Sequence, residues 1–173
     1  MLKKNLVKAF SEQVNAEYYS AYLYLVMSAY ADRAGFKGAA NWLFVQVQEE
    51  TAHGTHMYRH ILERGADPAF ADIKTPPSNF RGIKDIFDKV LEHERLVTER
   101  INNLASLALR ENDHASYNFI MWYVNEQTEE EAGVGDILAK IALADKNPGL
   151  LFTLDAELGN RTFVDPFPRT QAD

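Results

Sequence analysis

Glutamates recur at positions where helical periodicity predicts buried side chains. In segment 82–110, residues spaced three and four apart are apolar except Glu94, which lies at the centre of this stripe. Three further segments of helical period carry glutamates in the same central place: 5–33 with Glu17, 38–64 with Glu50, and 113–145 with Glu126 and Glu130. An unpaired carboxylate in a core costs several kcal/mol or becomes neutral, so this set requires compensating positive charge.

A metal ion is the natural source of that charge. The stripes contain no lysine or arginine near the glutamates, and Arg95 and Arg100 flank Glu94 on other faces of its helix. His53 follows Glu50 by three residues, which places its imidazole on the same face. A carboxylate-rich set with one imidazole suits iron or manganese, whereas zinc prefers more nitrogen or sulfur. The pattern therefore predicts a buried metal site.

Each of these residues also has a simpler interpretation, in which it binds no metal. A lone glutamate on an apolar stripe usually reaches solvent, but four central coincidences on four helices favour a shared site. Glu49 and Glu129 lie beside the stripes, so a solvated face stays open for both, and Tyr24 could be ordinary core. The remaining histidines have no support of the kind that Glu50 gives His53, and they are expected at the surface: His56, His60, His93 and His114.

The elements that must position these residues are all helices. Short links join the first helix to the second and the third to the fourth, which predicts two antiparallel hairpins. Segment 65–81 contains three prolines and can stretch about 55 Å, whereas the preceding helix is about 40 Å long. It can therefore cross the whole bundle. Pro148 suits the first turn of a short fifth helix, 148–159. We predict one domain over 1–173, an all-α, up-down-down-up four-helix bundle with one long crossover.

The composition of the chain excludes several classes of site and partner. The 173 residues include no cysteine, which excludes disulfides, iron–sulfur clusters and thiolate metal sites. A net charge of −7 argues against broad nucleic-acid binding and suits cationic partners. No apolar run reaches the length of a membrane span, and the N-terminus lacks the apolar stretch of a secretory signal. We expect a cytoplasmic protein that contacts neither membrane nor nucleic acid.

Two segments carry a family resemblance. QVQEETAH (46–53) and NEQTEEE (125–131), together with Glu17, Tyr24 and Glu94, resemble bacterial non-haem ferritin. The resemblance covers essentially the whole chain, including LLFTLDAELGNR (150–161) of the fifth helix. It implies a ferritin-like fold, ferroxidase activity with dioxygen or hydrogen peroxide, and a hollow shell of twenty-four subunits that stores ferric mineral, with the fifth helix at its four-fold axes.

The same resemblance implies roles for individual residues. Glu17, Glu50 and His53 would hold a first iron. Glu50 would bridge to a second iron held by Glu94 and Glu130, with Gln127 beside the centre near the oxidant and Tyr24 able to supply an electron or a hydrogen bond. A third iron site would be formed by Glu49, Glu126, Glu129 and Glu130.

Departures separate this chain from relatives with other activities. Bacterioferritins and many di-iron oxygenases repeat Glu-x-x-His on the fourth helix, but here Glu126 is followed by Gln-Thr-Glu129. Thr51 stands where bacterioferritin has a haem-ligating methionine, so no haem is expected. Two alternatives stay open: a di-iron oxidase or oxygenase of an organic substrate, and a non-enzymatic, DNA-protecting cage. The second would need a basic tail, and Lys3, Lys4 and Lys8 are few.

Overall fold

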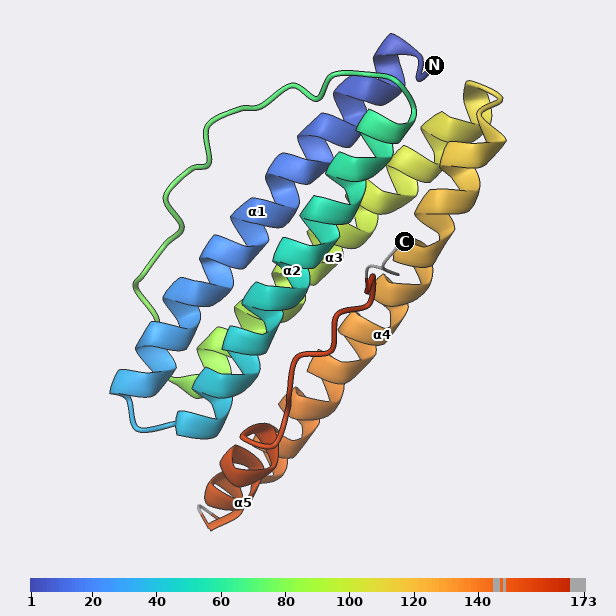
Figure 1. Cartoon of the computed structure of the whole chain (residues 1–173). Coiled ribbons are helices and arrows are strands. Elements are labelled where there is room, and N and C mark those ends of the chain that lie inside the picture. Colours follow the sequence, from blue (N-terminus) through green and yellow to red (C-terminus); the bar gives the residue numbers. More distant parts are fainter. Residues whose placement is uncertain (145–146, 148, 169–173) are drawn as a thin grey trace.

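Five helices make up the described part of the chain. A computed structural model describes residues 1–144, 147 and 149–168. Its helices are α1 (Lys4–Arg33), α2 (Lys37–Glu63), α3 (Ile83–Arg110), α4 (His114–Ala144) and α5 (Gly149–Leu158). The first four form a bundle and α5 lies at one end of it (Figure 1). The predicted all-α bundle with a long crossover and a short fifth helix is confirmed. The expected ends at Asp145 and Pro148 lie outside the described residues.

Tight turns close the two hairpins. Gly35, at φ 91°, ends α1, and Asn112, at φ 53°, follows α3; both residue types tolerate this left-handed region. Asp113 accepts a hydrogen bond from the Ser116 amide at 3.0 Å, which caps α4. The same carboxylate pairs with Arg64 at 2.8 Å, so the start of α4 is tied to the end of α2.

The crossover runs along the outer side of α1 from the end of α2 to the start of α3 (Figure 1). Asn15 donates to the carbonyl of Ala71 at 3.0 Å, and the amide of Ala69 donates to the Ser11 hydroxyl at 3.0 Å. These bonds hold an irregular segment against the bundle, and the long traverse makes α2 and α3 parallel.

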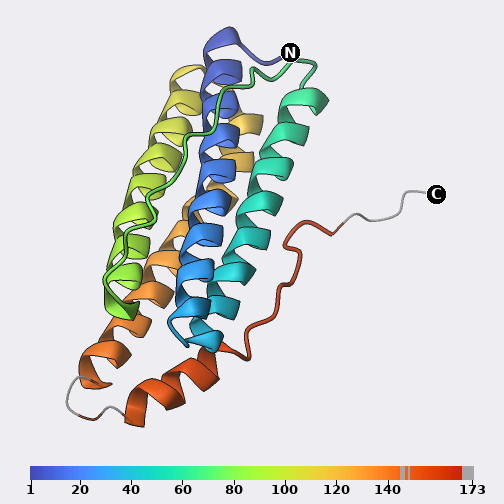
Figure 2. The ribbon, with the colours of Figure 1, turned by 90° about the vertical axis from the view of Figure 1, so that its left-hand side faces the viewer.

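Helix α5 lies across the end of the bundle, and the chain then turns back along α2 (Figure 2). The carboxylate of Asp155 accepts hydrogen bonds from the amides of Gly38 and Ala39 at 3.1 and 2.9 Å, in the first turn of α2. A Cβ at Gly38 would lie 1.6 Å from the carbonyl oxygen of Asp155. Only glycine therefore permits this approach.

The apolar core consists of two clusters rather than one. On α1, Val14 belongs to one cluster and Leu23 to the other; on α3, Val97 and Val90 are divided in the same way. The interval between the clusters on every helix of the bundle contains the glutamates singled out by the sequence. A polar layer thus crosses the middle of the bundle.

No described helix is long and apolar enough to cross a membrane.

Candidate metal centre

The polar layer is as buried as the core around it. Its members are Glu17, Glu50, His53, Glu94, Gln127 and Glu130, and the exposed fractions of their side chains run from 0 to 7%. Each lies near the middle of its helix, on the face toward the bundle axis, because apolar neighbours three or four residues away fix that face. The structure therefore brings these six residues into the interior, whereas Glu126, which the stripe of its helix also predicted to be buried, is only partly buried.

Three of these side chains converge on one point. Ligand atoms of Glu17, Glu50 and His53 lie within 4.8 Å of one another, the one such group found among the described residues. His53 Nδ1 is 3.7 Å from Glu50 Oε2. Gly54 helps this convergence, because a Cβ there would lie 3.3 Å from the Cβ of Glu17. Helices α1 and α2 can therefore approach closely at the level of the site.

Glu94 and Glu130 are held by neutral donors. The Tyr24 hydroxyl donates to Glu94 Oε1, and Gln127 Nε2 donates to Glu94 Oε2 at 3.0 Å. Gln46 Nε2 donates to Glu130 Oε2 at 3.0 Å. Gln13 does the same for Glu17 at 2.8 Å. Donors of this kind orient a carboxylate without neutralising it, so its charge stays available to a cation.

Burial is the main cause of the shifted pKa values in the layer. Burial raises the pKa of Glu94 and that of Glu130 to about 7. Burial also holds the pKa of Glu50 well above its usual range, and the charges of Glu17 and Glu94 raise it further. Burial lowers the pKa of His53 to about 4, which leaves the imidazole neutral and able to bind a metal.

Two buried atoms test whether a cation fits. Among the described residues, Glu50 Oε2 and His53 Nε2 are buried side-chain atoms without a hydrogen-bond partner. Such atoms are rare in folded proteins because each costs free energy. An oxygen-rich set with one imidazole, and with orphaned ligand atoms inside it, fits a transition-metal cation.

Three of the four carboxylates expected at a third site lie further out than Glu130, the fourth. Glu129 is exposed, whereas Glu126 and Glu49 are partly buried. Burial raises the pKa of Glu49 to about 7, despite an ion pair with Arg161 Nη2 at 2.7 Å. These residues do not converge as Glu17, Glu50 and His53 do.

The charge of Arg161 was not predicted, because Arg161 lies outside the four long helical stripes of the sequence. It follows α5 and reaches back to α2, where it also donates to Gln46 Oε1 and covers the ring of Trp42 at 4.6 Å. Gln46 lies in the segment that carried the family resemblance, but no spacing rule connects position 161 with it. One positive charge near the layer therefore comes from the C-terminal segment, and a second comes from Arg100 of α3, which donates to Gln13 at 3.0 Å and partly offsets the rise that burial causes in the pKa of Glu17.

The expectation that the other histidines lie at the surface holds for His114 and is wrong for His60. His60 is buried because its ring stacks on Phe119 at 3.9 Å and bonds to the Ser116 hydroxyl at 3.2 Å. His56 is half-buried against Phe167, with ring centroids 3.6 Å apart. None of the three belongs to the converging group.

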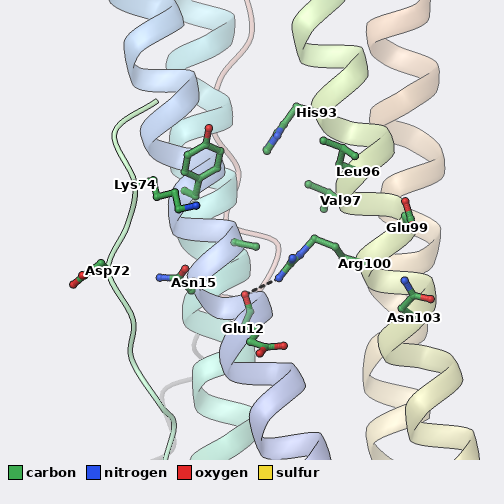
Figure 3. A pocket seen from close by; sticks show the side chains of 12 residues that line it. Glu12, Asn15, Asp72, Lys74, His93, Leu96, Val97, Glu99, Arg100 and Asn103 are labelled. Carbon is green, nitrogen blue, oxygen red and sulfur yellow. Dashed lines mark hydrogen bonds between the residues drawn. The ribbon is translucent and has the colours of Figure 1, made fainter. Parts of the chain in front are cut away.

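His93 is likewise half-buried, and its Nε2 lies 2.8 Å from the Ser20 hydroxyl. It lines a groove of about 500 Å³ between α1, α3 and the crossover, where Arg100 reaches the carbonyl of Glu12 (Figure 3). Lys74 and Asp72 line the crossover side of this groove. None of the predicted metal ligands lines it, so it is separate from the acidic layer.

Tyr123 and Trp122 support the imidazole of His53. The Tyr123 hydroxyl donates to the His53 carbonyl at 3.1 Å, and the Trp122 ring packs edge-on against the imidazole at 5.4 Å. Because both come from α4, they couple the ligand on α2 to the opposite hairpin.

Comparison with known proteins agrees with this arrangement. The ferritin-like domain model matches residues 7–144. A probable bacterial non-heme ferritin-like protein of Haemophilus influenzae is 38% identical over 92% of this chain and 97% of its own length. A bacterial non-heme ferritin of Staphylococcus aureus is 36% identical over 94% and 98%. The solved open pore ferritin of Archaeoglobus fulgidus is 43% identical, with a TM-score of 0.91 over 93% of this chain and 98% of that one.

Proposed function

The chain belongs to the ferritin family, and from that premise we propose that it oxidises Fe(II) to Fe(III) and stores the product as a ferric mineral. The observation that carries this proposal is the buried carboxylate layer with its orphaned atoms on Glu50 and His53. A polar layer of this kind weakens the fold unless cations use it. Iron is therefore the substrate that binds at this layer.

Two iron positions account for the six interior residues. The converging group of Glu17, Glu50 and His53 holds the first iron. Glu94 and Glu130 hold the second, and Glu50 bridges the two ions. Gln127, which already donates to Glu94, lies beside the pair where the oxidant is reduced.

The electron count requires a pair of ions. Two Fe(II) lose one electron each, which reduces dioxygen with two protons to hydrogen peroxide, or hydrogen peroxide with two protons to two waters. The carboxylates favour Fe(III) over Fe(II), because negative charge stabilises the more highly charged ion. Tyr24 donates a hydrogen bond to Glu94, from where it can also supply an electron.

A third cation position completes the proposal. Glu49, Glu126 and Glu129 lie outside the layer on the side of α2 and α4, and together with Glu130 they receive iron that leaves the pair. The charges of Glu130 and Glu126 each raise the pKa of Glu49, which supports their proximity.

We further propose that twenty-four subunits assemble into a hollow cytoplasmic shell, without haem. Large apolar side chains stay exposed on this single chain, among them Phe44 on α2, Leu143 on α4 and Phe152 on α5. Phe152 is 82% exposed, which is costly unless copies of α5 pack together. This supports subunit contacts through α5.

Aerobic addition of Fe(II) to the purified, assembled protein tests the function. Oxidant consumption, ferric absorbance and particle size should report rapid oxidation and a mineral inside an intact shell. Glu50→Ala should lose rapid oxidation, whereas Glu92→Ala, which changes an exposed residue of α3, should retain it. Equal initial rates in the two variants would refute the assigned centre.

A further inference from the structure

The segment that follows α5 returns along α2 to the acidic layer. Residues 159–168, which we call the return segment, run beside α2 and α4 (Figures 1 and 2). Asn41 on α2 donates to the carbonyl of Arg161 at 2.8 Å, which fastens its start. Near its end, Phe167 packs against His56 at 3.6 Å and Trp122 at 4.5 Å. Both anchors lie on the helices that carry Glu49 and Glu126.

At the first of these anchors, Arg161 brings a guanidinium to the outer carboxylates. It binds Glu49 at 2.7 Å and donates to Gln46, whose own amide donates to Glu130 at 3.0 Å. Its charge also acts on Glu126 and Glu130. Three of the four carboxylates proposed to take a third cation, Glu49, Glu126 and Glu130, thus already interact with one.

We propose that Arg161 is an internal cation at the outer carboxylates, and that a third metal ion enters only by displacing its guanidinium from Glu49. This inference rests on the proposed function, because it concerns where iron goes after the central pair. A planar guanidinium can hold Glu49 and Gln46 together, so its departure frees the carboxylate and changes the support of Glu130. The return segment thereby sets how readily the outer position accepts metal.

A purely structural role predicts something different. If Arg161 only fastened the return segment, its loss would loosen that segment and leave the affinity of the outer carboxylates for cations unchanged. If Arg161 competes with the metal ion for Glu49, removing the guanidinium should strengthen cation binding. The metal ion then no longer has to displace a positively charged partner from Glu49. The two roles are therefore separated by whether the loss of the guanidinium raises the affinity for the third cation.

Zinc binding to the assembled protein tests the competition without oxidation chemistry. Titration calorimetry and equilibrium dialysis would compare the unmodified protein with Arg161→Gln, Arg161→Gln/Glu49→Gln and Arg33→Gln. Arg33 lies exposed in the last turn of α1 and matches the loss of charge. In Arg161→Gln the third zinc should bind about tenfold more tightly, because one charge-assisted hydrogen bond no longer competes. The added Glu49→Gln change should abolish the gain, and Arg33→Gln should show none.

Unchanged or weaker binding of the third zinc in Arg161→Gln would overturn the proposal, as would an equal gain in Arg33→Gln. If the unmodified protein failed to bind the first two zinc ions, that result would instead contradict the proposed function. A crystal structure of the unmodified protein with three zinc ions tests the displacement independently of any variant. Arg161 should have left Glu49, and a guanidinium still paired with Glu49 beside the third ion would overturn the proposal.

Discussion

Replacing Glu130 by glutamine should remove a proton that cation binding otherwise releases. Burial raises the pKa of Glu130 to about 7, and that of Glu94 as well. Such carboxyl groups are largely protonated below pH 7, and a metal ion must displace those protons because it binds the ionised form. Glutamine keeps the shape and the acceptor for Gln46 but carries no titrating proton.

The expected magnitude follows from these pKa values. A group with a pKa of about 7 is protonated to about 0.9 at pH 6 and about 0.1 at pH 8. Glu94 and Glu130 together should therefore release about 1.6 more protons per subunit at pH 6 than at pH 8 on saturation with zinc. In Glu130→Gln this difference should fall to about 0.8.

Calorimetric zinc titrations in buffers of different ionisation enthalpy give the number of protons released. Glu63→Gln, an exposed residue at the end of α2, provides the matched control and should behave as the unmodified protein. The reasoning fails if the release is the same at pH 6 and pH 8. It also fails if Glu130→Gln leaves the difference between the two pH values unchanged.

Four further outcomes are expected. His53→Ala should lose rapid Fe(II) oxidation in stopped-flow traces while light scattering reports an unchanged particle size, since the imidazole serves the site and not subunit contacts. Glu129→Ala should oxidise the first two irons per subunit rapidly but alter later turnover; identical traces at low and high iron would remove the third site. The metal-free protein should melt at a lower temperature at pH 8 than at pH 5, because the stability linked to the raised pKa of Glu94 is present below about 4.5 and is lost as pH rises through about 7. Calorimetry showing the opposite trend would contradict this. Protein purified from haem-replete cells should lack a Soret band, because Thr51 offers no thioether; a band that persists through gel filtration would contradict this.

Much of the bundle could be predicted because helical periodicity is a local property. The stripe around Glu94 identifies a buried face without reference to any other helix, and the prolines of the 65–81 segment mark the crossover. The structure departs from expectation where tertiary packing decides burial. His60 was expected at the surface, yet Phe119 and Ser116 from α4 enclose it.

The carboxylates of the metal centre could be predicted from the sequence for the same reason. Glutamates in the middle of apolar stripes are visible in the sequence, because no core accepts them without compensation. Their hydrogen-bond donors were less visible: Gln13 lies four residues before Glu17 and could have been found from helical spacing, whereas Gln46 bonds to Glu130 across 84 positions. Local spacing carries no information about such a contact.

The sequence by itself determined that carboxylates occupy the interior, because the face of a helix follows from its own periodicity. Only the tertiary structure decided how closely the side chains converge: Glu17 meets Glu50 and His53, the group that the family resemblance implied, while Glu49 remains outside. That distinction depends on how α1 and α2 approach at Gly54. Arg161 is the extreme case, since it lies 112 positions from Glu49 and reaches it because Asp155 and Asn41 fasten α5 and the residues after it to the first turns of α2. Long-range packing, and no local pattern, put that charge beside the acidic layer.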